Sequence, residues 1–320
     1  MIPISDIKLF AEELIRWGDD ESLLLSATHS NPWFDRSAVR ERLNAVSAVL
    51  SADAVIWPDN RSTSPVTIAF YNIDRIPLEN IVSVLWFLAA GHRVLIKRSG
   101  GDDVLLKRIV ALLHAISPGL KNSLLYTQHP IPDAQLYILD EKVSESDVNK
   151  YFAGKKVYRQ KRRTSAAIID GTEDETMLRN LVHDMCSFFG LGPGNVRKLF
   201  LPVGYDIGAI FRSAEQYQHL KDHHHYFNAY QYAYSLYLIE NIKFFENGFL
   251  ILREDTRSGP PTSVVFYEFY RNNADLEEKL SQTDFSRLYA KPGGDPNAFP
   301  FGASVSQCTD PATELIGQLI

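Results

Sequence analysis

The sequence contains little cysteine and no stretch typical of a secretion signal. Only Cys186 and Cys308 occur among its 320 residues, too few for a disulfide framework or a cysteine-based zinc site. The N-terminus, "MIPISDIKLFAEELIRWGDD", alternates charged and apolar residues at helical spacing, whereas a signal peptide has an unbroken apolar core. We therefore expect a reducing compartment and a cytoplasmic protein.

An excess of positive charge and a membrane-length apolar run are also missing. The formal net charge is -6 and the isoelectric point is near 5.9, which argues against nucleic acid as a partner because phosphate binding needs a basic surface. The longest apolar run, "IVSVLWFLAAG" at 81–91, is too short to cross a bilayer and predicts a buried helix. With 45% hydrophobic residues, the chain is large enough for two packed domains.

What the sequence does contain is a nearly regular alternation of helical and strand patterns. Helical spacing of apolar residues marks 6–17, 36–50, 78–90, 104–117, 145–153, 173–189, 208–220 and 225–241. Asp35 and Ser144 stand where helix N-caps are expected. Runs of β-branched and aromatic residues mark strands at 66–71, 93–97, 123–127, 134–139, 165–170, 198–202, 249–254 and 263–270. The alternation predicts an α/β protein with mostly parallel sheets and helices on both faces.

The basic stretch "KKVYRQKRR" at 155–163 interrupts the alternation, and we place a domain boundary there. The first domain is then 1–163 and the second 164–294. The Pro- and Gly-rich segment "YAKPGGDPNAFPFG" predicts a connection that returns residues 295–320 to the first domain. The basic stretch itself is either a solvated strand and turn or an anion site for an adenosine phosphate, a CoA phosphate or an acidic partner.

The stretch "MCSFFGLGPGNVRKLFLP" at 185–202 predicts the end of a helix, a Gly-rich turn and a buried strand. A turn of this kind can expose a reactive side chain, but it carries Pro193, which has neither a nucleophile nor a backbone N–H. Cys186 lies seven residues earlier on the apolar face of the helix. It is either a buried structural thiol or a displaced nucleophile.

Two other features have an ordinary and a functional interpretation. The histidines at 223–225 are adjacent, whereas helical metal ligands usually stand four residues apart, so we expect no metal site. The aromatic helix from Tyr226, with Tyr230, Tyr234 and Tyr237 at helical spacing, predicts core or dimer-interface packing rather than a ligand box.

Several motifs together resemble the LuxC-type acyl-CoA reductases, a branch of the aldehyde dehydrogenase superfamily, and in particular their short stand-alone bacterial relatives. The motifs, spread over the whole chain in the order found in that family, are "NPWF" (31–34), "IP" followed by "GHRVLIKRS" (76–99), "FFGLG..NV.KLF.P.GYD" (188–206), "HH.Y.N.Y.Y" (from 224), "NGFLILRED" (247–255) and "PFG....QC" (300–308).

The resemblance implies an aldehyde-dehydrogenase-like α/β fold with a Rossmann-type cofactor domain and a catalytic-type domain. It also implies NADPH- or NADH-dependent reduction of an acyl thioester to an aldehyde through an acyl-cysteine intermediate. That reaction needs a thiolate nucleophile and hydrogen-bond donors for the oxyanion. The ligand would be an acyl-CoA or an acyl carrier.

Carried over by position, the family's functional residues are mostly replaced. Pro193 stands where the family has its nucleophilic cysteine, and Arg75 stands at the oxyanion asparagine before the "IP" pair. Asp140 and Glu141 replace a small polar turn that faces the cofactor. Lys97 matches the superfamily lysine at the adenosine ribose, and we assign Lys97 and Ser99 of "LIKRS" to cofactor binding.

These replacements leave two functions in competition. The first is an acyl-CoA reductase homologue that has lost catalysis and serves as a binding or partner subunit, either with another protein or as a homodimer. The second is an active NAD(P)H-dependent reductase with a rearranged site, in which Cys186 would be the substitute nucleophile. The number and positions of the cysteines favour the first.

Overall fold

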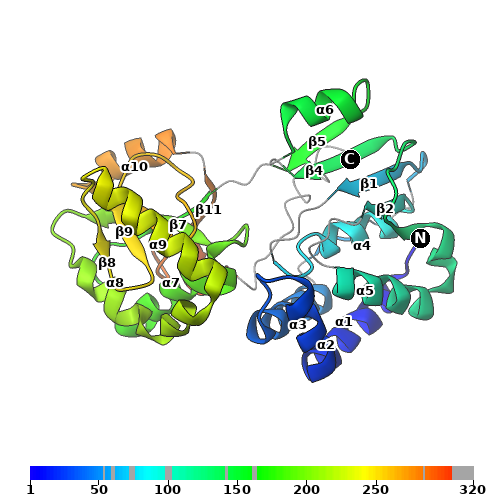
Figure 1. The fold of residues 1–320 in the computed structure, drawn as a ribbon, viewed down its shortest axis with the longest axis horizontal. Coiled ribbons are helices and arrows are strands. Elements are labelled where there is room, and N and C mark those ends of the chain that lie inside the picture. The colour runs from blue at the N-terminus through cyan, green and yellow to red at the C-terminus, as the bar shows by residue number, and fades with distance from the viewer. Residues whose placement is uncertain are drawn as a thin grey trace. The chain divides into compact units, whose positions relative to one another are not determined.

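The structure is a computed structural model, and it describes residues 1–52, 55–58, 62–71, 76–97, 103–140, 143–160, 164–283 and 285–304. The described residues form two compact units, the first up to Gln160 and the second from Thr164 to Ser304 (Figure 1).

The first unit is a five-stranded parallel sheet with the strand order β3-β2-β1-β4-β5. Its elements are α1 (Ile4–Gly18), α2 (Glu21–Ser30), α3 (Arg36–Ser51), β1 (Thr67–Tyr71), α4 (Ile81–Ala89), β2 (Arg93–Lys97), α5 (Asp103–Ile116), η1 (Pro118–Asn122), β3 (Leu124–Thr127), β4 (Leu136–Asp140), α6 (Glu145–Tyr151) and β5 (Val157–Gln160). The strand order reverses between β1 and β4, as in Rossmann-type folds.

Both faces of this sheet are apolar, because successive residues of a strand point to opposite faces. Ile68 and Phe70 of β1 join the large core formed with α1 to α5, whereas Ala69 joins a second core with Tyr137 and Phe152. All nine residues of α4 are buried, which confirms the buried helix expected from the longest apolar run. Asp35 and Ser144 cap α3 and α6 as predicted.

The second unit is a seven-stranded sheet with the order β12-β11-β6-β7-β10-β9-β8, parallel except for the pair β8 and β9. Its elements are β6 (Thr164–Ile168), α7 (Glu175–Cys186), η2 (Ser187–Gly190), β7 (Val196–Pro202), α8 (Ile207–Ala214), η3 (Glu215–Asp222), α9 (His224–Ile239), β8 (Phe245–Glu246), β9 (Ile251–Glu254), β10 (Val264–Tyr270), α10 (Asn273–Gln282), β11 (Phe285–Ala290) and β12 (Phe299–Pro300).

The α/β class with parallel sheets is therefore confirmed, but the predicted path of the C-terminal segment is wrong over residues 295–304. These residues stay with the second unit, because Phe299 and Pro300 pair with the neighbouring strand β11 and Phe301 is buried. The rest of the predicted return, 305–320, lies outside the described residues.

Two helices and several edge strands were not expected from the sequence. In α2 three consecutive leucines obscure the helical spacing, and in α10 the apolar stripe consists of only Leu276 and Leu280, which are partly buried. Strand β5 lies inside the basic stretch, as predicted for that segment, but its residues are partly buried and Gln160 is buried rather than solvated.

Candidate functional site

The turn that carries Pro193 begins with a strained backbone. After α7 ends at Cys186, Phe188 and Phe189 have φ angles of 51° and 59°, and Gly190 follows with 68°. The left-handed conformation costs roughly 1–2 kcal/mol for each residue with a side chain. Burial of both phenylalanines and stacking of Phe189 on His223, with ring centroids 4.0 Å apart, help to hold this conformation.

Hydrogen bonds close the turn around Pro193. The backbone N–H of Gly192 donates to Oδ1 of Asn195 at 2.7 Å, and the N–H of Asn195 donates back to the carbonyl of Gly192 at 3.1 Å. The Asn195 side chain also donates to the carbonyl of Asp184 at 2.8 Å. Pro193 itself is half-buried just before β7, and its carbonyl accepts from Ser165. The turn is thus well formed although its central side chain has no reactive group.

Cys186 is a free, buried cysteine, only 3% exposed. Burial raises the pKa of its thiol to about 12. Because the thiolate is the nucleophilic form, this thiol is poorly suited to attack an acyl group. The other cysteine, Cys308, lies outside the described residues.

A buried ion pair that sequence reasoning missed lies on the strand after the turn. Nζ of Lys198 in β7 is 2.6 Å from Oε1 of Glu268 in β10, and it also donates to the carbonyl of Asp255. Burial lowers the pKa of Lys198, and the hydrogen bond to Glu268 opposes this effect. A charged residue within the strand pattern "VRKLFLP" was the available signal. The contacts indicate a structural role, because they hold the chain that connects β9 to β10.

In the first unit, the assigned cofactor residues are only partly described. Lys97 ends β2 and Asp140 ends β4, so both lie at the carboxyl edge of the parallel sheet, where such folds bind ligands. Lys97 is half-buried and Asp140 is buried. Arg75, Ser99 and Glu141 lie outside the described residues.

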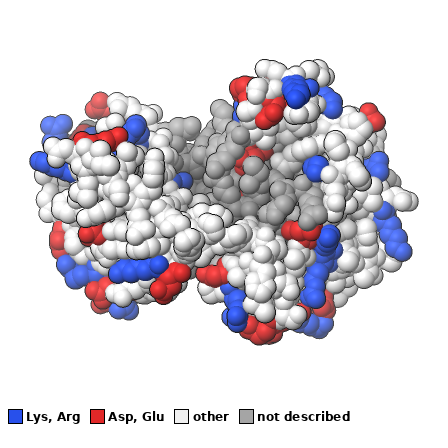
Figure 2. All heavy atoms as spheres, viewed as in Figure 1, with Lys and Arg blue, Asp and Glu red and all other residues white. Residues whose placement is uncertain are grey.

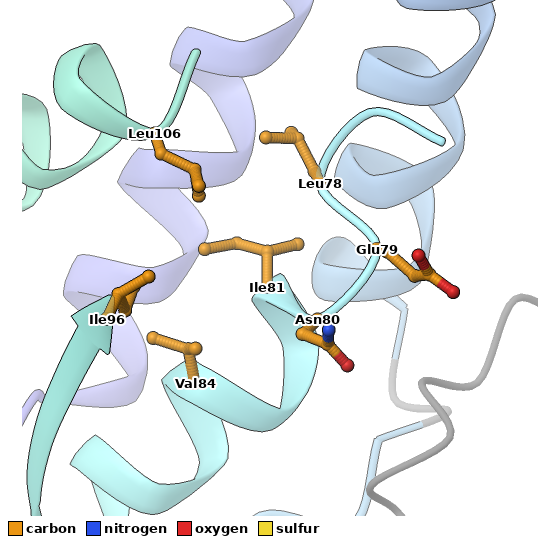
Figure 3. Close-up of a pocket in the computed structure, with 7 residues that line it drawn as sticks. All are labelled: Leu78, Glu79, Asn80, Ile81, Val84, Ile96 and Leu106. Atoms are coloured by element: carbon orange, nitrogen blue, oxygen red, sulfur yellow. The ribbon is translucent and has the colours of Figure 1, made fainter. Parts of the chain in front are cut away.

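A small cavity lies near this edge of the sheet (Figure 3). Figure 3 shows apolar side chains turned toward one another, whereas the polar ends of Glu79 and Asn80 point away from them. The apolar residues are Leu78, Ile81, Val84, Ile96 and Leu106. Asn80 accepts a hydrogen bond from Gln160 at 2.7 Å. The lining is that of a gap in a core, and it offers no charged contact for a cofactor phosphate.

The aromatic helix follows its ordinary interpretation. Tyr230 and Tyr237 are buried and Tyr234 is partly buried against the sheet, which confirms the predicted packing of α9. Among the residues described, no group of three His, Cys, Asp or Glu side chains could hold a metal ion. No described helix is both long and apolar enough to span a membrane.

Charged side chains are mixed rather than separated. On the face seen in Figure 2, Lys and Arg are interspersed with Asp and Glu. Within the basic stretch, Lys155 lies over the Tyr137 ring at 4.8 Å and Arg159 pairs with Glu145. Residues 161–163 lie outside the described part of the chain.

Comparison with known proteins supports the fold and goes no further. No protein-family model matches the sequence, and no curated protein matches it. The aldehyde dehydrogenase KauB from Pseudomonas aeruginosa matches with a TM-score of 0.65 at 12% identity, over 97% of this chain and 75% of that one. Aldehyde dehydrogenase C from Pseudomonas syringae, solved as a variant with NAD+ and octanal, matches with a TM-score of 0.62 at 13% identity, over 95% and 73%.

Proline utilization A matches with a TM-score of 0.60 at 14% identity, over 90% of this chain but only 36% of that one. This chain thus spans about a third of that protein and about three quarters of the two dehydrogenases. Both units are covered by these matches. The chain therefore has the α/β fold of the aldehyde dehydrogenases.

Proposed function

We propose that this protein is a homologue of the LuxC-type acyl-CoA reductases that has lost acyl-cysteine catalysis and acts as a non-catalytic binding or partner subunit. The observation that carries the proposal is the turn at 192–195, which is closed by hydrogen bonds but has Pro193 where the resembling family has its nucleophile. Cys186, buried with a pKa near 12, is a poor substitute.

A folded turn that lacks a nucleophile is better suited to binding a ligand than to acyl transfer. The left-handed residues Phe188 and Phe189 keep a conformation that is costly unless the surroundings determine it. On this proposal, the turn keeps its strained backbone although it carries no nucleophile. The ligand class that suits the proposal is an acyl-CoA or an acyl carrier, bound without transfer of the acyl group.

The proposal includes weak binding of the nicotinamide cofactor. Asp140 ends β4 at the edge where Rossmann-type folds bind a dinucleotide, and the adjacent Glu141 adds a second carboxylate to the sequence. Negative charge there opposes a pyrophosphate, whereas the positive charge of Lys97 favours it. Calorimetric titration with NADPH and with NADH is expected to show weak binding or none, and sub-micromolar affinity would contradict this part of the proposal.

The decisive experiment follows acyl transfer directly. The native protein and Pro193→Cys are incubated with a panel of acyl-CoAs, and intact-mass spectrometry and NADPH consumption are recorded. The native protein is expected to form no adduct, because a thioester needs a thiolate within reach of the acyl carbon. An adduct mapped to Cys186 would instead support the alternative, an active NAD(P)H-dependent reductase with a rearranged site.

The Pro193→Cys variant tests how much of the machinery is missing. We expect little reductase activity, because Arg75 would still replace the oxyanion asparagine, and loss of one oxyanion donor costs about a hundred- to a thousandfold in rate. Robust turnover by the variant would mean that proline alone disables the site.

A further inference from the structure

The last described residues, 299–304, pack against the turn that carries Pro193. The backbone oxygen of Ser304 lies 2.7 Å from the position that a Cβ on Gly194 would occupy. The two backbones can approach this closely only because residue 194 has no side chain. Phe301 and Ala303 are buried, so this stretch is a packed part of the second unit.

Asp184 joins the stretch to helix α7. Its carboxylate accepts the backbone N–H of Gly302 at 2.6 Å and that of Ser304 at 2.8 Å, and the residue is fully buried. The carbonyl of Asp184 accepts the side-chain amide of Asn195, which closes the turn. One residue therefore holds both the turn and the stretch that covers it.

Titratable groups near Asp184 do not pair with it in the described part of the chain. On α7, the His183 ring is 2.7 Å from the hydroxyl of Tyr217 in η3, and the Cys186 thiol is buried and neutral. On β11, a guanidinium nitrogen of Arg287 lies 2.7 Å from the position that a Cβ on Gly194 would occupy. Residues 299–304 carry no ionisable side chain. The carboxylate is thus held by backbone N–H groups.

We propose that residues 299–304 form a clamp on the Pro193 turn, and that the charge of Asp184 sets how readily this clamp opens. Burial raises the pKa of Asp184 to about 6, and the hydrogen bonds from Gly302 and Ser304 oppose that rise. Opening exposes the carboxylate to water, where its pKa returns toward 3.8. The proton therefore favours the closed clamp.

The sign of the pH dependence follows from the difference between the pKa of Asp184 in the closed clamp and its pKa in the open clamp. Stabilisation by the proton is fully present below the pKa of the open state and is lost as the pH rises through about 6. Between pH 5 and pH 7 the equilibrium constant for opening should rise about tenfold, and it should then level off. The clamp is independent of the proposed loss of catalysis, because it concerns only the second unit's own contacts.

Hydrogen exchange with mass spectrometry tests the clamp in the full-length protein. After correction for intrinsic exchange, the amides of 299–304 should report an equilibrium constant for opening about tenfold larger at pH 7 than at pH 5. The amides of Leu199–Leu201 in β7 should show no such change. In Asp184→Asn the pH dependence should vanish, because a carboxamide does not titrate. Asp206→Asn, at the exposed N-cap of α8, is the matched control and should keep it.

A flat profile in the native protein, or an unchanged pH dependence in Asp184→Asn, would overturn the proposal. A measurement on the native chain covers the case in which Asp184→Asn does not fold. The carboxyl carbon of Asp184, followed by NMR, should titrate with a midpoint near 6, and a midpoint near 3.8 would overturn the proposal.

Discussion

The two units of this chain surround their buried charges differently. In the first unit, Arg42 of α3 is only 1% exposed and donates to the backbone carbonyls of Pro77 and Leu78. In the second unit, Lys198 pairs with the buried carboxylate of Glu268, and the buried carboxylate of Asp184 accepts backbone N–H groups.

Buried charges specify structure in both units. Apolar burial is nondirectional and tolerates repacking, whereas a buried charge costs several kcal/mol unless its partners are placed correctly. In the second unit, Asp184 lies on α7 and Lys198 on β7, before and after the Pro193 turn, and Glu268 lies on β10. Directional contacts of the second unit therefore lie beside this turn.

Replacing Lys198 should have the largest effect on stability. In Lys198→Met the Glu268 carboxylate stays buried without its closest cation, and breaking a buried pair in this way costs about 3–5 kcal/mol. Native-state hydrogen exchange in urea, read on the amides of β7, measures the loss within the second unit.

Lys279→Met is the control for this prediction, because Lys279 contacts the same carboxylate at 3.4 Å from a partly exposed position. Exposed pairs contribute about 0–1 kcal/mol. Equal losses for the two variants would show that burial of Lys198 is not what matters.

A cavity in the first unit should cost slightly less. Leu85 lies in α4 with no exposed surface, and Leu85→Ala is expected to lose about 2–5 kcal/mol through lost burial and the cavity left behind. Leu9→Ala, at a position 50% exposed on α1, should lose far less. The comparison between the units predicts that exchange of the β7 amides stays unchanged in both variants, and a parallel loss there would show that the units unfold together.

Much of the fold could be predicted because short residue patterns determine most of its helices and strands. The spacing of apolar residues located α3, α5 and α9, and the β-branched runs located β1, β2 and β10. Helix α10 was missed because only Leu276 and Leu280 form its apolar stripe, and β11 because its burial is irregular along the strand. The path of residues 295–304 was predicted wrongly because strand pairing, which no local pattern encodes, keeps them in the second unit.

For the candidate site, the sequence could predict which residue types are present but not which distant residues they contact. The sequence alone identified the turn at Pro193, and the burial of Cys186 follows from the apolar face of α7. Asp184 was missed although it stands three residues after Leu181, at the spacing of that apolar face. Its partners, Gly302 and Ser304, are far away in the chain, so their contact with Asp184 depends on tertiary structure.

The smallest effect is expected at the turn itself, in Gly194→Ala. A Cβ at this position would stand 2.7 Å from the backbone oxygen of Ser304 and 2.7 Å from a guanidinium nitrogen of Arg287. The arginine can move aside, but the backbone oxygen cannot move unless residues 299–304 shift. We expect a loss of about 1–3 kcal/mol, as for other overpacked sites, with faster exchange of the amides in 299–304.

Gly119→Ala is the matched control, because a Cβ there meets no atom within 4 Å. It should be neutral or stabilising by about 0.4–1 kcal/mol, since alanine restricts the unfolded chain. Loss of stability in Gly194→Ala without faster exchange in 299–304 would place the strain elsewhere in the turn. The close approach of Gly194 to Ser304 would then contribute little to holding residues 299–304 against the turn, and the hydrogen bonds to Asp184 would be what keeps them there.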